Sequence, residues 1–438
     1  MATDTRKRLA AAVTVVGAAV LALVAAELGL RAWERAGAGA KALDYGDVWR
    51  EGGLGEGGLL KEGLSARVRD GYGGTVRWVN DAAGFRRDDD VSRERAPGGL
   101  RVLSLGDSFT AGYRVGQEET FSYLLEEHLE AAGRWTEVEV LISLIESPPT
   151  GLLYLERHGL GWHPDLVLLG LTLGNDVAQA YLILDPRGEL RLAAGGGDGP
   201  AIVENPDADQ EALVADHRGW TLPRRCFDPE AASPPEPRPA PERGGLRLAR
   251  LAASRLAAWR EREAPATVAS VWRRYRRPLL FDNHGLGLYL AEPPPRVRRA
   301  YDRLFALLRA YRDLCEAHGV RFAVALFPQR FQVQERDWRA TVAAYGLDPG
   351  CFDLMAPNRR IAAFCRRAGI PCLDPTEDFA RRFEASWESL YLPRGDMHWN
   401  ARGHRAFFEA TREQVEELAV AATEARPTPR PPRPAARP

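Results

Sequence analysis

The chain has 438 residues, and its 59 basic and 60 acidic side chains give a formal net charge of -1. This length allows one large domain or two ordinary ones with a sizeable core, and the balanced charge gives no indication of a nucleic-acid partner. Five cysteines in so long a chain exclude a disulfide scaffold, and the odd number leaves at least one thiol unpaired. Cys365 and Cys372 are close enough in sequence to pair, and no cysteine or histidine spacing indicates a metal site.

The N-terminus predicts a membrane anchor over residues 1–31. Basic residues at 6–8 precede an uncharged stretch from Leu9 to Ala26, which is just long enough to cross a hydrocarbon core. The positive-inside rule then keeps the N-terminus in the cytoplasm. A cleaved signal peptide is the alternative, because the small residues at 37–42 offer a cleavage site. Either interpretation places the rest of the chain outside the cytoplasm.

Residues 32–95 are interpreted as a juxtamembrane spacer followed by a strand and a turn. The part up to residue 74 is glycine-rich and predicts little regular structure. The stretch TVRWVNDAAGF, at 75–85, predicts a strand that runs into a turn.

The next part of the chain alternates between two kinds of pattern. Short runs that are apolar on both faces are typical of buried parallel strands, and they occur at 101–106, 138–144, 165–171 and 321–327, with a weaker fifth at 371–374. Helical patterns lie between and after them, at 121–133, 151–159, 296–318, 358–369 and 404–418. This alternation predicts βαβ units and a doubly wound α/β sheet, whose ligand sites lie at the carboxyl ends of the strands.

Residues 181–295 interrupt the alternation and are interpreted as an insertion. They include a glycine-rich part, a proline-rich part and a basic helical part that contains Trp272. Such a composition favours a solvated linker with a surface helix, and a lid or a membrane-facing segment is the alternative. The tail at 421–438 is rich in proline and arginine and is expected to be disordered.

The first candidate for chemistry is Ser108, in the stretch LSLGDSFTAG at 103–112. A strand-like run ends at Gly106, and an acid and a serine follow it. Such a serine is either a nucleophile presented at a strand end or an ordinary turn or helix-cap residue, and Asp107 could cap a helix equally well.

A base and an acid for this serine occur near the C-terminus, in DMHWNARGH at 396–404. A seryl nucleophile needs a base to take its proton and an acid to orient that base. Asp396 and His398 stand two residues apart in a predicted loop and can point to the same side. The alternative is that Asp396 forms a turn and His398 packs at the start of the last helix.

A third fragment, LGND at 173–176, follows the predicted strand at 165–171. Gly174 would let the backbone approach a ligand, and the Asn175 amide could donate to a developing oxyanion. An ordinary turn or helix cap is the alternative. Because these fragments follow core strands or precede the last helix, all three can meet at one edge of the sheet.

The order GDSF, then GND, then an Asp-His pair before the final helix resembles the SGNH (GDSL-type) hydrolase superfamily. The resemblance implies a flavodoxin-like three-layer α/β/α sandwich with a central parallel sheet, formed here by residues 96–180 and 296–420. It also implies ester hydrolysis or acyl transfer without a metal or cofactor.

The resemblance implies a role for each matching residue. Ser108 would be the nucleophile and an oxyanion donor through its N–H, and Asn175 beside Gly174 would complete the oxyanion site. His398 would be the base, and Asp396 its orienting acid. The continuation Trp399-Asn400 is similar to membrane-tethered members linked to polysaccharide O-acetylation. The G-x-S-x-G motif of α/β-hydrolases is absent, because Thr110 stands where its second glycine would be.

Two features depart from the SGNH pattern. The family usually has a glycine after the second strand, whose N–H is a third oxyanion donor, and Leu144 or Ile145 stands near that position here. Losing one such donor costs on the order of 100- to 1,000-fold in rate. The acid also stands two residues before the histidine, where three is the commoner spacing.

These observations predict a serine esterase or O-acyltransferase that acts on an extracytoplasmic ester, with an acylated carbohydrate as the expected substrate. We expect a single-pass membrane protein with its catalytic domain outside the cytoplasm, and its partner could be a membrane-bound acyl donor. A catalytically impaired glycan-binding or scaffold protein of the cell envelope and a lipid-acting esterase are the alternatives.

Overall fold

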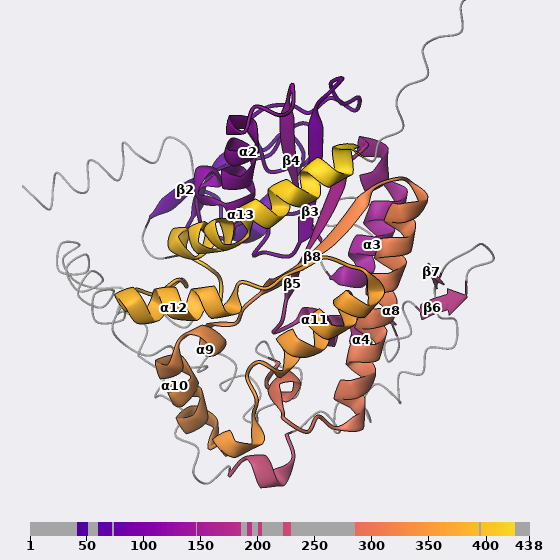
Figure 1. The fold of residues 1–438 in the computed structure, drawn as a ribbon. Coiled ribbons are helices and arrows are strands. Elements are labelled where there is room, and N and C mark those ends of the chain that lie inside the picture. Colours follow the sequence, from indigo (N-terminus) through magenta and orange to yellow (C-terminus); the bar gives the residue numbers. More distant parts are fainter. Residues whose placement is uncertain are drawn as a thin grey trace, which may run out of the picture.

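The centre of the computed structural model is a five-stranded parallel sheet (Figure 1). The structure describes residues 42–50, 60–71, 74–145, 147–184, 191–194, 200–203, 222–228, 285–393 and 396–424. The strand order in the sheet is β4-β3-β5-β8-β9, with β3 at Leu100–Gly106, β4 at Val138–Leu144, β5 at Leu166–Thr172, β8 at Arg321–Phe327 and β9 at Cys372–Leu373. The predicted doubly wound α/β sheet is therefore confirmed, and these are the five strands that the apolar runs indicated.

Burial on both faces explains why these runs are almost continuously apolar. Every residue of β3, β4 and β5 is buried, and in β8 only Arg321 is exposed. The register pairs Gly106 at the end of β3 with Leu144 of β4, and it pairs Leu105 with Leu169 of β5. The carboxyl ends of β3, β4 and β5 consequently lie at one edge of the sheet, where residues 107–112, 145 and 173–176 leave it.

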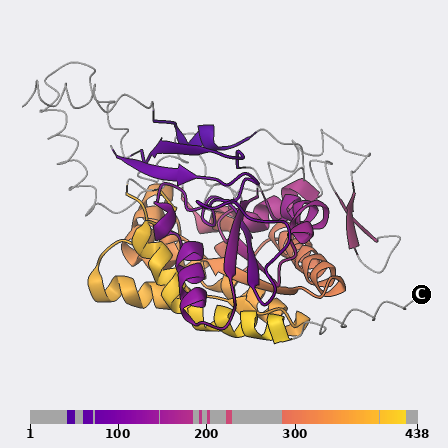
Figure 2. The same ribbon diagram turned by 90° about the horizontal axis from the view of Figure 1, so that it is seen from above.

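Helices cover both faces of the sheet and form a three-layer arrangement (Figures 1 and 2). One apolar cluster joins a face of the sheet to α2, α12 and α13, at Phe121–Ala131, Thr376–Ser386 and Ala401–Glu424. Another joins the opposite face to α3, α4, α8 and α11, at Pro148–Arg157, Asp176–Leu184, Pro295–Ala317 and Ala356–Ala368. Two further helices, α9 at Arg330–Val333 and α10 at Glu335–Tyr345, follow β8.

The N-terminal part of the described chain forms a small antiparallel hairpin on the side of the sandwich. Strand β1 (Ser65–Arg69) pairs with β2 (Thr75–Val79), which Figure 2 shows in indigo alongside the layers. Trp78 is fully buried in a cluster that includes Ala111 and Leu144 of the main domain. The predicted strand at the start of 75–85 is present, but the glycine-rich composition before residue 75 did not predict β1.

The insertion is described only in part. Its described pieces include a short hairpin of β6 (Arg191–Ala194) and β7 (Pro200–Val203). Cys226 forms a disulfide with Cys351, 125 residues later, so the pairing that sequence proximity allowed, Cys365 with Cys372, is not the one in the structure. These two cysteines are free thiols.

The predicted anchor at Leu9–Ala26 and the tail at 421–438 lie mostly or wholly outside the described residues, which end at 424. Among the helices that the structure describes, none combines the length and the apolar character needed to cross a bilayer.

A buried ion pair ties β3, the strand before Ser108, to its neighbour. The Arg101 guanidinium donates to the Glu139 carboxylate on β4 at 2.6 Å, and their side chains are only 1% and 8% exposed. The remaining Arg101 donors bond to the carbonyls of Ser92, Arg93 and Trp162. This one side chain therefore joins β4, the loop before β3 and the turn before β5.

Arg101→Gln is expected to destabilise the protein by about 3–5 kcal/mol, because it leaves the Glu139 carboxylate buried without its cation. Urea unfolding of the two proteins measures this difference. Arg339→Gln is the matched control: Arg339 pairs with Glu335 on the surface, with both side chains 73% exposed, so its loss should cost at most about 0.5 kcal/mol. Equal losses of unfolding free energy in the two variants would show that the buried pair of Arg101 and Glu139 stabilises the protein no more than a surface pair does.

Candidate active site

Ser108 lies in the first turn after β3, in a short helical turn closed by Gly112. The Asp107 side chain accepts from the Phe109 N–H at 2.9 Å and caps the start of the turn. At its end, the Tyr113 N–H donates to the Ser108 carbonyl and the Gly112 N–H donates to the Phe109 carbonyl. This pair of bonds is a Schellman motif, which needs the left-handed conformation that Gly112 adopts at φ 70°. The Ser108 side chain is thereby presented on a defined turn above the strand end.

Close packing holds this turn against the sheet. Thr110 lies over Gly106 and Gly170, since a Cβ atom on either glycine would come within 2.7 Å of the Thr110 hydroxyl oxygen. From the other side, the fully buried Arg86 donates to the carbonyls of Ala111, Gly112 and Val115. The glycines leave room for the turn, and Arg86 fixes its far end.

His398 and Asp396 lie in a loop that is anchored on both sides. Trp399, directly after the histidine, is fully buried among aromatic rings of the core. Asn400 caps α13 by accepting from the N–H groups of Arg402 and Gly403. Arg330 donates to the carbonyl of Asp396 at 3.2 Å. The imidazole is therefore flanked by residues that are held in place, Asp396 before it and Trp399 and Asn400 after it.

Ser108, His398 and Asp396 form a continuous chain of hydrogen bonds. The Ser108 Oγ is 2.7 Å from the His398 Nε2, and the His398 Nδ1 is 2.6 Å from the Asp396 Oδ1. Because the carboxylate only accepts, Nδ1 carries the proton and Nε2 is free to accept the proton of Ser108. The His398 and Asp396 side chains are 25% and 17% exposed, so a ligand can reach them from solvent.

Neighbouring groups fix the imidazole and the acid. The Tyr113 ring lies 4.2 Å from the His398 ring, and the Phe109 ring lies 4.9 Å from it. The second carboxylate oxygen of Asp396 faces the Arg114 guanidinium at 3.7 Å. Arg114 has a φ of 62°, a conformation that is uncommon for a side chain other than glycine. The sequence reasoning did not identify Tyr113 and Arg114, although they follow the GDSFTAG stretch directly.

The predicted oxyanion residues lie next to the turn that carries Ser108. Asn175 follows β5, and its Nδ2 is 3.4 Å from the Asp107 Oδ2. Gly174 is buried, and a Cβ atom there would come within 2.8 Å of the Gln329 side chain. The structure thus brings Asn175 to the residue before Ser108, and Gly174 provides room for Gln329.

The third oxyanion donor is missing from the positions that the sequence indicated. The Ile145 N–H donates to the Gly106 carbonyl at 2.8 Å and extends the ladder between β3 and β4. Successive N–H groups of a strand point to opposite sides, so that of Leu144 faces the outer edge of β4. Among residues 142–145, no N–H is therefore directed to Ser108, and residue 146 lies outside the described residues.

The other histidine of the motif region, His404, does not act as a base here. It is buried in α13, and its Nδ1 accepts from the Phe121 N–H at 3.4 Å. Burial lowers the pKa of His404 to about 3, so the ring stays neutral at physiological pH. In the described part of the chain, no three His, Cys, Asp or Glu side chains are grouped so as to hold a metal ion.

Two buried carboxyls lie beneath the site. Asp107 and Asp176 are 8% and 2% exposed. The pKa of each is raised, in both cases mainly by burial, and the neighbouring Asp107 raises the pKa of Asp176 further. The Asp176 Oδ2 accepts from the Thr172 N–H at 2.7 Å, whereas its Oδ1 has no hydrogen-bond partner among the described residues. This pair favours a protonated Asp176 in the folded protein.

Comparisons with known proteins give only distant likenesses. No protein-family model and no curated protein matches the sequence. Among solved structures, the acetyl xylan esterase AlAXEase is 12% identical with a TM-score of 0.35, over 72% of this chain and 100% of that one. TesA is 10% identical with a TM-score of 0.33, over 73% and 99%. A GDSL-like lipase of Bacteroides thetaiotaomicron is 11% identical with a TM-score of 0.29, over 73% and 88%. Likeness at this level assigns neither a family nor an activity.

The raised pKa of Asp176 predicts a specific pH dependence of stability. The folded state keeps a proton on Asp176 that the unfolded state releases near pH 4, and this retained proton favours the folded state at low pH. The stability that it contributes is lost as the pH rises through the folded-state pKa of Asp176. Asp176→Asn keeps an oxygen for the Thr172 N–H and removes the titration. Its free energy of unfolding should therefore fall less than that of the wild type between about pH 5 and pH 8.

Urea unfolding at both pH values measures this difference. Asp88→Asn is the control, because Asp88 is exposed and pairs with Arg77 at the surface, and it should keep the wild-type slope. A slope for Asp176→Asn that equals the wild-type slope would show that Asp176 is ionised in the folded protein.

Proposed function

We propose that this protein is a serine-dependent ester hydrolase or acyl transferase, with Ser108 as the nucleophile, His398 as the base and Asp396 as the orienting acid. The observation that carries the proposal is the unbroken hydrogen-bond chain from the Ser108 Oγ through His398 to Asp396. These three groups in this order are the machinery of nucleophilic acyl transfer.

The reaction begins when the His398 Nε2 takes the Ser108 proton as the Oγ attacks the ester carbonyl. The imidazolium that forms is stabilised by the Asp396 carboxylate at Nδ1. The tetrahedral intermediate then expels the alcohol, which receives the proton from Nε2, and the acyl group remains on Ser108. A water molecule or a second alcohol, deprotonated by His398, attacks this acyl-enzyme and releases Ser108.

Two groups are assigned to the oxyanion. The Ser108 N–H lies at the start of the capped turn, and the Asn175 Nδ2, which contacts Asp107 with one hydrogen, has a second hydrogen to donate. Ile145 is excluded because its N–H is used in the sheet. A site with two donors still supports acyl transfer, but at a lower rate than one with three.

We assign an acylated carbohydrate as the substrate class and leave water and a sugar hydroxyl as alternative acceptors. The Asp396-x-His398-Trp399-Asn400 sequence supports this assignment, since it resembles tethered proteins of polysaccharide O-acetylation. An accessible His398 and Asp396 are compatible with a large substrate. A membrane-bound acyl donor would be the partner of a transferase.

We also propose a single-pass membrane protein with its catalytic domain outside the cytoplasm. The basic residues at 6–8 and the apolar run Leu9–Ala26 support the anchor. The disulfide between Cys226 and Cys351 supports an oxidising compartment.

A fluorophosphonate probe is expected to label the full-length protein stoichiometrically, because the activated Ser108 Oγ attacks phosphorus as it attacks a carbonyl. Ser108→Ala should abolish the labelling and the hydrolysis of short-chain acyl esters. Asp396→Asn should lower kcat by about 10⁴-fold, because it favours the wrong imidazole tautomer. Mass spectrometry of the labelled peptide and a chromogenic acetate assay measure these effects.

Ser92→Ala is the control for the nucleophile, because the Ser92 carbonyl, not its side chain, is what binds Arg101. Its labelling should equal that of the wild type. Absence of labelling in the wild type at every pH between about 6 and 9 would reject the enzyme and favour a glycan-binding or scaffold protein.

Asn175→Ala is expected to lower kcat by about 100- to 1,000-fold with little change in KM, because the amide is assigned to the transition-state oxyanion and not to the bound ester. Steady-state hydrolysis of an acetate ester measures the two constants. A variant with unchanged kcat would remove Asn175 from the oxyanion site. An increase in KM alone would make it a substrate-binding residue instead.

A further inference from the structure

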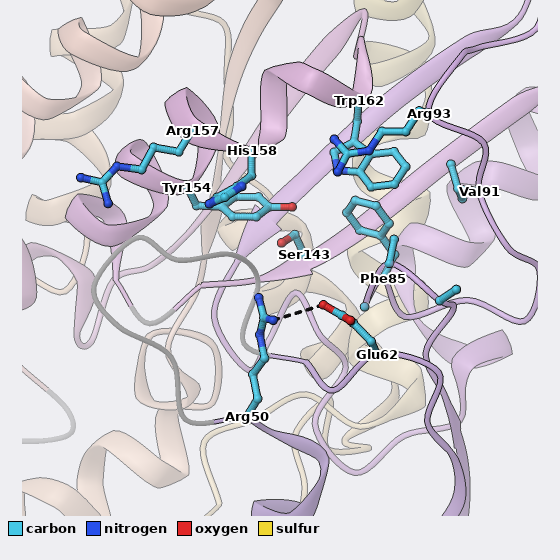
Figure 3. A pocket seen from close by; sticks show the side chains of 13 residues that line it. Arg50, Glu62, Phe85, Val91, Arg93, Ser143, Tyr154, Arg157, His158 and Trp162 are labelled. Atoms are coloured by element: carbon cyan, nitrogen blue, oxygen red, sulfur yellow. Dashed lines mark hydrogen bonds and ion pairs between the residues drawn. The ribbon is translucent and has the colours of Figure 1, made fainter.

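We propose that a second site binds a carboxylate-bearing sugar, in a cavity at the outer edge of β4. The cavity has a volume of about 840 Å³. It lies between Arg50 and Glu62 on one side, the loop at 82–93, and the end of α3 (Figure 3). None of Ser108, Asp396 and His398 lines it. Small-molecule sites commonly have volumes of about 300–1,000 Å³, so this cavity can hold a sugar residue with part of its neighbour.

The charge around the cavity favours an anion. Three arginines line it, Arg50, Arg93 and Arg157, against a single carboxylate, Glu62. Glu62 pairs with Arg50 at 3.2 Å, a contact drawn in Figure 3. Neither Arg93 nor Arg157 has a carboxylate partner among the described residues. The excess of positive charge and the planar guanidinium donors suit a carboxylate.

The position of Arg93 leaves its donors available. Its guanidinium stacks on the Trp162 ring at 4.1 Å, and the Phe85 ring packs against the same tryptophan edge-to-face at 5.0 Å. A stacked guanidinium presents its N–H groups at its edge, where an anion can accept from them. The aromatic pair thus fixes the direction of a donor group at the cavity wall.

The floor of the cavity has the features that a sugar body requires. The hydroxyls of Ser143 and Tyr154 lie close together there (Figure 3), and the two residues are 1% and 5% exposed. Each hydroxyl both donates and accepts, as sugar hydroxyls do. Phe85 and Val91 supply apolar surface beside them for the C–H face of the ring. A phosphate or sulfate ion alone would use the arginines and leave these groups without a role.

This inference goes beyond the proposed reaction, because it concerns a different part of the molecule. The residues before 95 supply Arg50, Glu62, Phe85, Val91 and Arg93, and they lie outside the segments whose motifs indicate the hydrolase. The site would hold an acidic residue of a glycan while the reaction occurs elsewhere, and it does not depend on the chemistry at Ser108.

The test is calorimetric titration of the full-length Ser108→Ala protein with trigalacturonate, which cannot be processed by this variant. We expect saturable binding, and binding to the neutral galactose trimer at least about tenfold weaker, since the arginines then have no charged partner. Arg93→Gln and Arg157→Gln should each weaken trigalacturonate binding by about tenfold or more. Arg339→Gln is the control, because this exposed arginine pairs with Glu335 on α10, and it should bind as the parent does.

Three results would overturn the proposal: no saturable binding, equal affinity for the neutral trimer, or unchanged affinity in both cavity variants. Displacement of trigalacturonate by inorganic phosphate at equal concentration would also overturn it, because the cavity would then be a simple anion site. Fluorophosphonate labelling of Arg157→Gln with Ser108 intact should match the wild type. Failure of the sugar site and failure of the proposed reaction are therefore distinguished.

Discussion

The hydrogen bond between Ser108 and His398 is the contact on which the rest of the site depends, and it joins residues 290 positions apart at 2.7 Å. Loop closure over such a distance is entropically costly, so the contact exists only because a rigid framework brings both loops to the same place. The parallel sheet provides that framework. Its strands end at one edge, where the turn after β3 meets the loop before α13.

Each of the two loops is held by a buried arginine that bonds to backbone carbonyls. Arg86 binds the carbonyls of residues 111, 112 and 115 at the end of the turn that carries Ser108. Arg330, which pairs with the buried Asp337, binds the carbonyls of Leu392 and Asp396 in the loop of the acid. Burying a guanidinium is costly unless its donors are satisfied, and here the carbonyls satisfy them. The positions of Ser108 and His398 are thereby fixed by groups that take no part in the hydrogen bond between them.

The described residues before β3 position the loops of Ser108 and Asp396 to an extent that their glycine-rich composition does not indicate. They supply Arg86, which binds the turn that carries Ser108, and Trp78 packs in one cluster with Ala111 of that turn. The Arg114 guanidinium, which faces Asp396, packs so closely on Gly71 in the turn of the hairpin that a Cβ atom there would clash with it. The hairpin and the acid of the site are therefore linked through one side chain. The same segment forms the wall of the cationic cavity beside β4.

The sequence by itself determined the strands of the sheet and the residues of the hydrogen-bond chain. Runs that are buried on both faces must be apolar at every position, so β4 and β8 have the bounds that their patterns predicted, Val138–Leu144 and Arg321–Phe327. Ser108, Asn175 and the Asp396-His398 pair were found because each follows a strand or precedes a helix in a recognisable order. Only the tertiary structure decided the pairing of Cys226 with Cys351 and the use of the Ile145 N–H in the sheet. It also decided the placement of Arg86 and Arg330 against the two loops. These are contacts between distant residues or backbone groups, and no local pattern of side chains encodes them.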